Sequence, residues 1–134
     1  MRMSACGLFA LALVGLGACG GTDDRPATWS YVHAAIIAPN CTTSACHSEL
    51  SKTAGLNFET PESAYIFLTG RVCDGTTGVE PPPRNFVTPF RPAESKLMYL
   101  LLGTELETMP PDVPLPEADI DLIERWILEG AQCN

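Results

Sequence analysis

The sequence predicts an all-α domain that follows a removable N-terminal segment. Four segments place apolar residues at helical spacing, and each is bounded by residues that favour a helix start or stop. No segment of useful length alternates apolar and polar residues as a half-buried strand does, and no internal repeat is present. These observations together indicate a small domain of about four helices.

The first expected helix covers residues 28–37. Thr28 can cap its N-terminus, because a threonine hydroxyl accepts a hydrogen bond from a backbone N–H of the first turn. Pro39 is expected to end the helix, because the residue before a proline is pushed toward extended geometry. The apolar face of this helix consists of Trp29, Val32, His33, Ile36 and Ile37. On such a face His33 is expected to be a packed or rim histidine and not a ligand.

The second and third expected helices have clear boundaries. The second begins after Thr60, with Pro61 at its first position, where a missing N–H is tolerated. Gly70 is a plausible stop for it. The third fits residues 93–102 and is closed by Gly103.

The fourth expected helix, residues 117–129, has the clearest pattern and is followed by Gly130 as its C-terminal stop. Its apolar stripe consists of Ile120, Ile123, Trp126 and Ile127. Its acidic residues gather near the first turn, which the helix dipole favours. They are interpreted as a solvated face and not as a catalytic pair; they are Glu117, Asp119, Asp121 and Glu124.

A long proline-rich loop, residues 71–92, separates the second helix from the third. It contains five prolines and no helical pattern. Loops of this length are usually functional or disordered.

The first eighteen residues have the pattern of an export signal. Arg2 precedes an apolar run over residues 5–18, and this run is too short to span a bilayer as a permanent helix. The run ends in Leu16-Gly17-Ala18-Cys19, which resembles a bacterial lipobox. That resemblance implies removal of residues 1–18, lipidation of Cys19 and, because no Asp follows Cys19, an outer-membrane location in a two-membrane bacterium.

The expected organisation is therefore a signal peptide over residues 1–18, a lipid-anchored tether over residues 19–27 and one domain over residues 28–134. The protein is expected to be exported and to face the periplasm or lie at the outer membrane. The alternative is an ordinary signal peptide cut near Ala18, which would leave Cys19 free.

Charge and size limit the possible functions. Removal of residues 1–18 leaves 116 residues that keep all sixteen acidic residues and seven of the eight basic ones, for a net charge of −9. Such a charge argues against nucleic acid and against anionic lipid as electrostatic partners. A small domain with a modest core usually needs disulfides, a metal or a cofactor to be stable.

The segment Cys41-Thr42-Thr43-Ser44-Ala45-Cys46-His47 directly follows the first helix. The usual covalent haem motif is C-x-x-C-H, in which two thiols attach the haem and the histidine binds its iron. Here the spacing is wider by two residues, which can bulge out between the thiols. Met109 lies 62 residues beyond His47, in Thr108-Met109-Pro110-Pro111, and its thioether is a suitable second axial ligand.

On these residues the chain resembles class I c-type cytochromes, particularly the small cytochrome domains of planctomycete and myxobacterial exported proteins. The resemblance covers nearly all of residues 29–131. It implies that the first and last helices cross, with Trp29 near Trp126. It also implies that Cys41, Cys46 and His47 hold a covalent haem c whose sixth ligand is Met109. The further residues that carry it are Gly55-Leu56-Asn57-Phe58, Tyr65, Ser95-Lys96-Leu97 and Asp119 through Ile127.

The cysteines, histidines and methionines also allow arrangements without haem or with a different ligand. Cys41 and Cys46 can form a local disulfide in an oxidising compartment. A zinc site built from them with His47 and His33 lacks the usual ligand spacing. Met98 rivals Met109 as a ligand, but it lies within a helical pattern, where a core methionine is the commoner case.

Cys73 and Cys133 are expected to form a disulfide that ties the proline-rich loop to the end of the last helix. The expected function is that of a membrane-tethered monohaem electron carrier, not an enzyme, whose redox partners present a basic docking face. A haem enzyme or sensor is expected only if the sixth ligand is absent. The alternative is a haem-free, disulfide-stapled envelope lipoprotein that acts as an interaction module.

Overall fold

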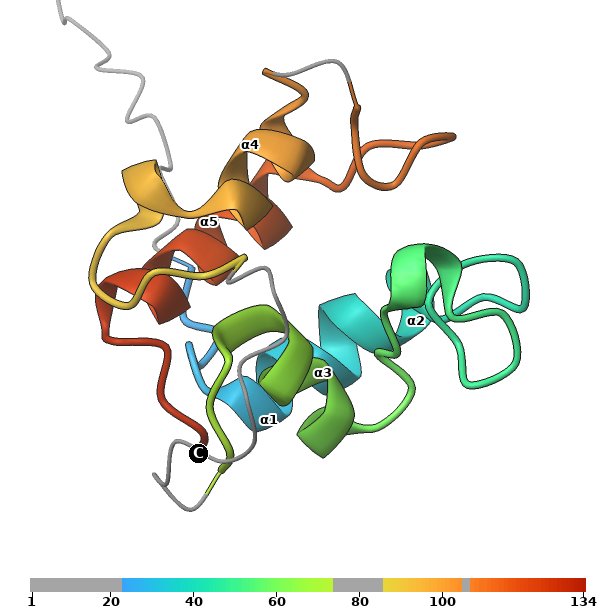
Figure 1. The fold of residues 1–134 in the computed structure, drawn as a ribbon. Coiled ribbons are helices and arrows are strands. Elements are labelled where there is room, and N and C mark those ends of the chain that lie inside the picture. Colours follow the sequence, from blue (N-terminus) through green and yellow to red (C-terminus); the bar gives the residue numbers. More distant parts are fainter. Residues whose placement is uncertain (1–22, 74–85, 105–106) are drawn as a thin grey trace, which may run out of the picture.

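The computed structural model describes residues 23–73, 86–104 and 107–134, and these residues form a helical domain without strands (Figure 1). The predicted all-α class is confirmed for this part of the chain. The signal segment and Cys19 lie outside the described residues, as do residues 74–85 of the proline-rich loop. Within the described ranges, no helix is long and apolar enough to span a membrane.

The first helix runs further than the sequence predicts. It consists of α1 (Trp29–Val32), a π-helical turn (His33–Ile37) and α2 (Ala38–Cys41), which follow one another without a break. The expectation that Pro39 ends the helix is therefore wrong. The Ala38 N–H reaches five residues back to the His33 carbonyl, so the helix is wider just before Pro39. That widening accommodates a ring that would meet a carbonyl in a regular α-helix.

Side chains satisfy backbone carbonyls around Pro39. The Asn40 amide donates to the Ile36 carbonyl at 2.8 Å, and the Thr42 hydroxyl donates to the Ala38 carbonyl at 2.6 Å. These side chains satisfy carbonyls in the last turn of the helix, where backbone donors run out. As a result Cys41 lies at the end of a helix and not in a free loop.

The next two helices follow the predicted boundaries closely. Helix α3 (Pro61–Thr69) begins at a capping box formed by Thr60 and Ser63 and ends at Gly70 in the left-handed conformation. Helix α4 (Lys96–Leu102) ends at Gly103, as expected, but begins three residues later than predicted.

The late start of α4 has a local cause at Ser95. Its buried hydroxyl accepts the Thr88 N–H at 2.9 Å and donates to the Arg91 carbonyl at 2.9 Å. Ser95 is extended, so residues 92–94 form a separate 3-10 turn. The sequence pattern predicted most of this turn as part of the helix.

The first helix unit crosses α5 (Glu117–Leu128) at the centre of the core. The Trp29 and Trp126 ring centroids lie 5.0 Å apart, and the Tyr65 ring of α3 lies 5.5 Å from Trp29. The Trp29 indole donates to the Pro61 carbonyl at 3.0 Å, and the Trp126 indole donates to the Gln132 carbonyl at 2.9 Å. Three helices therefore meet at aromatic side chains whose buried polar atoms are paired.

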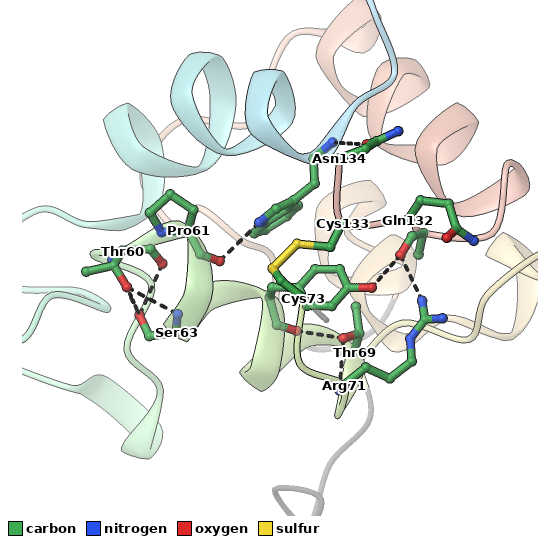
Figure 2. Close-up of a disulfide and its surroundings, with 12 residues drawn as sticks. Thr60, Pro61, Ser63, Thr69, Arg71, Cys73, Gln132, Cys133 and Asn134 are labelled. Atoms are coloured by element: carbon green, nitrogen blue, oxygen red, sulfur yellow. Dashed lines mark hydrogen bonds between the residues drawn. A yellow bond between two sulfur atoms is a disulfide. The ribbon is translucent and has the colours of Figure 1, made fainter. Parts of the chain in front are cut away.

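A disulfide joins Cys73 to Cys133, the pairing expected from the sequence (Figure 2). Beside it, the Arg71 guanidinium donates to the Ala131 carbonyl at 2.8 Å and lies 5.8 Å from the Tyr65 ring centroid. The Tyr65 hydroxyl donates to the same carbonyl at 2.9 Å. The chain after α5 is thus held against α3 by one covalent bond and several hydrogen bonds.

Replacement of one or both disulfide cysteines should lower the free energy of unfolding by a similar amount. The 60-residue separation of Cys73 and Cys133 predicts a loss of about 4 kcal/mol in the free energy of unfolding when the bond is absent. Urea unfolding of the mature protein should give similar losses for Cys73→Ser, Cys133→Ser and the double variant, because each removes the same bond. A double variant that loses the sum of the two single effects would contradict the pairing.

Candidate cofactor site

A largely apolar cavity lies between the end of α2, the C-terminal half of α3, α4 and the loop that follows α4. Its volume is about 120 Å³, and it opens to solvent on one side. We call it the cysteine cavity. Its lining residues are Ile37, Asn40, Cys41, Cys46, His47, Ala54, Leu56, Phe58, Leu68, Phe86, Lys96, Leu97, Leu100, Leu101, Glu107, Met109, Pro110 and Pro111.

All four residues that the sequence assigns to a haem line this cavity. Cys41 comes from the end of α2, Cys46 and His47 come from the turn that follows, and Met109 comes from the loop after α4. The fold therefore brings Met109 to the same cavity as a histidine 62 positions earlier in the chain. Helix α4, which lies between His47 and Met109 in the sequence, contributes Leu97, Leu100 and Leu101 to the apolar wall of the cavity.

The turn between the two cysteines absorbs the widened spacing. The His47 N–H donates to the Cys41 carbonyl at 3.0 Å, and the Cys46 N–H donates to the Thr43 carbonyl at 2.8 Å. Residues 43–45 are exposed, so the added length projects into solvent. The chain then returns to place Cys46 and His47 beside the helix end that carries Cys41.

His47 is held in one orientation and one tautomer. Its Nδ1 lies 3.0 Å from the Thr53 carbonyl oxygen. A carbonyl only accepts, so Nδ1 carries the proton and Nε2 keeps a free electron pair for a metal. Burial lowers the pKa of His47, although contacts with the Thr53 and Leu56 carbonyls oppose the shift. At neutral pH the imidazole is therefore neutral, the form that binds a metal.

Phe58 supports His47 from the side. The two ring centroids lie 4.7 Å apart, and the Phe58 N–H donates to the His47 carbonyl at 2.7 Å. The Phe58 carbonyl in turn lies 3.0 Å from His33 Nε2. His33 is buried, so it behaves as the packed histidine that its helical position predicts.

The two candidate methionines occupy different places. Met109 packs partly buried against the core, and its N–H donates to the Leu100 carbonyl at 2.9 Å. Met98 is buried within α4 and lines a separate groove between α4 and α5. Of the two, Met109 alone borders the cavity that contains Cys41, Cys46 and His47.

Three polar residues of the cavity were assigned no role from the sequence. Asn40, Lys96 and Glu107 all line it, and Lys96 is the sole lysine or arginine among its lining residues. The Lys96 ammonium lies 5.8 Å from the Phe86 ring centroid. Lys96 was part of the resemblance to cytochromes, but no spacing rule marks a lone surface lysine as part of a site.

The arrangements without haem find less support in the geometry. Cys41 and Cys46 are both free thiols, so the local disulfide is not formed. The Nε2 atom of His33 is engaged by a carbonyl, which removes it from a zinc site with Cys41. Among the described residues no three His, Cys, Asp or Glu side chains gather as a metal-binding group.

Comparison with known proteins returned no significant match to this chain among protein-family models, curated proteins or solved structures. Any function assigned to the cysteine cavity is therefore argued from its own residues. The chemistry of those residues is two thiols, a neutral imidazole and a thioether around an apolar space.

The Cys41 thiol should react slowly with alkylating agents in the haem-free chain. Burial, and to a smaller extent the charge of Cys46, raises the pKa of Cys41 to about 11 from an ordinary value near 9. At pH 8 the reactive thiolate is then about a hundredfold rarer than in an ordinary cysteine. Iodoacetamide kinetics on a refolded Cys19→Ser, Cys46→Ser variant of residues 19–134 should show a rate that still rises between pH 9 and 11.

The same variant in urea is the control, because unfolding restores the solvent around Cys41. Its rate at pH 8 should increase about a hundredfold, and its pH profile should level off near pH 9. A native profile that already levels off near pH 9 would contradict the burial of this thiol.

Proposed function

We propose that the protein is a monohaem c-type cytochrome, anchored to the cell envelope through Cys19, that transfers single electrons. The observation that carries the proposal is the convergence of Cys41, Cys46, His47 and Met109 on one cavity. The residues fit the group: the cavity wall is mostly apolar, and one imidazole nitrogen is free for iron. Two free thiols at the same wall suit covalent attachment.

The thiols supply the attachment. Each sulfur would form one bond to a vinyl carbon of the haem, and its hydrogen would go to the neighbouring carbon, so no oxidant would be consumed. Cys46 directly precedes His47, which keeps one attachment point beside the axial ligand. Residues 43–45, within the widened spacing, are exposed, and both cysteines line the cavity.

The axial residues determine the kind of chemistry. When bound, haem supplies an iron that accepts and releases one electron. His47 is oriented by the Thr53 carbonyl, which also increases the basicity of the imidazole. Met109 presents a thioether, a soft ligand that raises the reduction potential relative to a second histidine. If His47 and Met109 both bound the iron, they would leave no place on it for a substrate, so we propose an electron carrier and not an enzyme.

Charge suggests the nature of the partners. The mature chain carries a net charge of −9, so a redox partner should present a basic docking face. Within the cysteine cavity, Lys96 is suited to pair with a carboxylate of the cofactor. The alternative, a haem-free lipoprotein stapled by the Cys73–Cys133 disulfide, leaves the two free thiols at the cavity without a role.

Replacement of the proposed sixth ligand should change both the visible spectrum and the reduction potential. Met109→Leu keeps the volume of the side chain but removes sulfur, so the thioether-dependent features should disappear and the potential should fall. Redox titration of the purified protein, followed by visible absorption, measures both. Covalent attachment should persist, so the haem band should stay with the protein after denaturation and reduction.

Met98→Leu is the matched control, because it makes the same chemical change in a buried methionine that does not border the cavity. Its spectrum and potential should remain those of the unmodified protein. A change in Met98→Leu with none in Met109→Leu would show that the sixth ligand is misassigned. No haem band in any of the proteins would reject the cytochrome proposal itself.

A further inference from the structure

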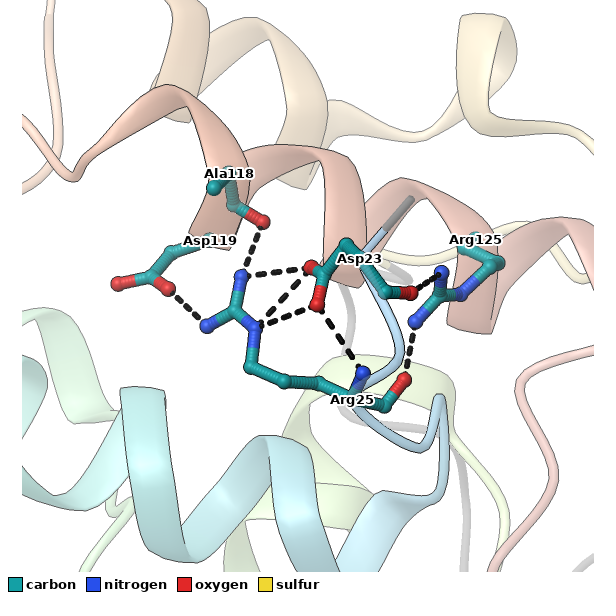
Figure 3. Close-up of polar contacts among 5 residues, drawn as sticks. All are labelled: Asp23, Arg25, Ala118, Asp119 and Arg125. Atoms are coloured by element: carbon teal, nitrogen blue, oxygen red, sulfur yellow. Dashed lines mark hydrogen bonds and ion pairs between the residues drawn. The ribbon is translucent and has the colours of Figure 1, made fainter. Parts of the chain in front are cut away.

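Residues that the sequence assigned to the tether lie against the folded domain. The Arg25 guanidinium donates to the Asp23 carboxylate, to the Asp119 carboxylate and, at 2.7 Å, to the Ala118 carbonyl (Figure 3). In the opposite direction, Arg125 of α5 donates to the Asp23 carbonyl at 2.9 Å and to the Arg25 carbonyl. We call Asp23, Arg25, Asp119 and Arg125 the N-terminal clamp.

The N-terminal clamp is reciprocal and partly shielded from solvent. Arg25 belongs to the terminal segment and holds α5, whereas Arg125 belongs to α5 and holds the backbone of the segment. The Arg25 and Asp23 side chains are each 29% exposed, and that of Asp119 is 20% exposed. Hydrogen bonds from Arg25 lower the pKa of Asp23 to about 2, so this carboxylate is ionised at any physiological pH.

The position of the clamp decides how much free chain separates the domain from Cys19. Four residues lead from Cys19 to Asp23, and ten lead from Cys19 to Trp29, the first residue of α1. Fully extended, these lengths are about 14 Å and about 35 Å. A domain of this size has a radius of gyration of about 13 Å. A tether of about 14 Å therefore prevents free tumbling next to a bilayer, whereas one of about 35 Å permits it.

The clamp also lies away from the cysteine cavity. No residue of α5 and none of residues 23–36 lines that cavity. One face of α4, with Leu97 and Leu100, forms part of the cavity wall. The other side of α4 faces α5 across the groove that contains Met98. In Figure 1 the first described residues run beside α5, and the loop after α2 lies at the opposite end of the molecule.

We infer that the N-terminal clamp orients the domain on the lipid bilayer, with the α5 side toward the membrane and the cysteine cavity away from it. This orientation rests on the proposed lipid anchor at Cys19. In this orientation Arg25 and Arg125 determine which face of the domain is exposed to a redox partner. A partner would then approach the cavity from the aqueous side.

Energy transfer to the bilayer tests the orientation without reference to haem. A donor dye is placed either at Leu128→Cys, three residues after Arg125 on the exposed side of α5, or at Leu50→Cys, in the exposed turn after His47. The lipidated full chain is bound to phosphatidylcholine vesicles that contain acceptor lipid. Donor lifetimes with and without acceptor should show stronger transfer from position 128 than from position 50.

The difference between the two positions should vanish when the clamp is broken. In Arg25→Gln, Arg125→Gln the tether lengthens, so both dyes should transfer to a similar extent. Arg91→Gln is the matched control, because Arg91 forms an exposed ion pair with Glu94 outside the clamp, and it should keep the difference. Hydrogen exchange at residues 23–28 should rise in the clamp variant alone.

The outcomes separate the orientation from the proposed function. Equal energy transfer from positions 128 and 50 in the protein with an intact clamp would overturn the orientation. So would a difference in transfer that persists in the clamp variant. Neither result would contradict the haem site or the anchor. A chain that does not bind the vesicles at all would overturn the anchor and the orientation with it. The haem band, measured separately, reports on the cytochrome proposal.

Discussion

The backbone hydrogen bond from the His47 N–H to the Cys41 carbonyl closes the segment between the two cysteines. It fixes where the helix end, the second thiol and the imidazole lie relative to one another. The bond depends on Cys41 being helical, and therefore on the widened turn that carries the helix past Pro39. A helix that ended before Pro39 would leave Cys41 in a loop and the cavity without a fixed wall.

The same end of the molecule is completed from distant parts of the chain. Thr53 orients His47, and Phe58 packs beside it. Helix α4 forms the apolar wall, and its Leu100 carbonyl positions Met109 through a backbone hydrogen bond. Elsewhere, the Trp29 and Trp126 contact and the Cys73–Cys133 disulfide hold the helices that support this wall. The packed core thus supports the wall of the cysteine cavity.

The sequence predicted those features that depend on a few neighbouring residues. Thr60 and Gly70 mark the two ends of α3, and Gly103 marks the end of α4, because caps act locally. The prediction failed at Pro39, where a wider turn compensates for the proline ring. No local rule anticipates that compensation.

The cavity itself was expected from resemblance, since the 62-residue separation of His47 and Met109 does not indicate proximity. Asn40 carries no sequence signal of its own, and Lys96 was named only within the resemblance, so the place of both in the cavity is known from the fold. Arg25 was assigned to a polar tether, because nothing in its neighbours shows that α5 supplies carboxylate and carbonyl acceptors. Such pairings depend on which elements meet, and that is decided by the whole core.

Covalent attachment of one haem to the segment that contains Cys41 and Cys46 is the step on which the proposed function depends. The intact mass of the mature protein, purified from membranes and denatured, measures that attachment when compared with the mass of a Cys41→Ser, Cys46→Ser variant. We expect the unmodified chain to carry the mass of one haem on the segment that contains residues 41–47, and the variant to carry none. A mature chain with no such added mass, or a variant that retains haem, would show that these two thiols do not attach the cofactor.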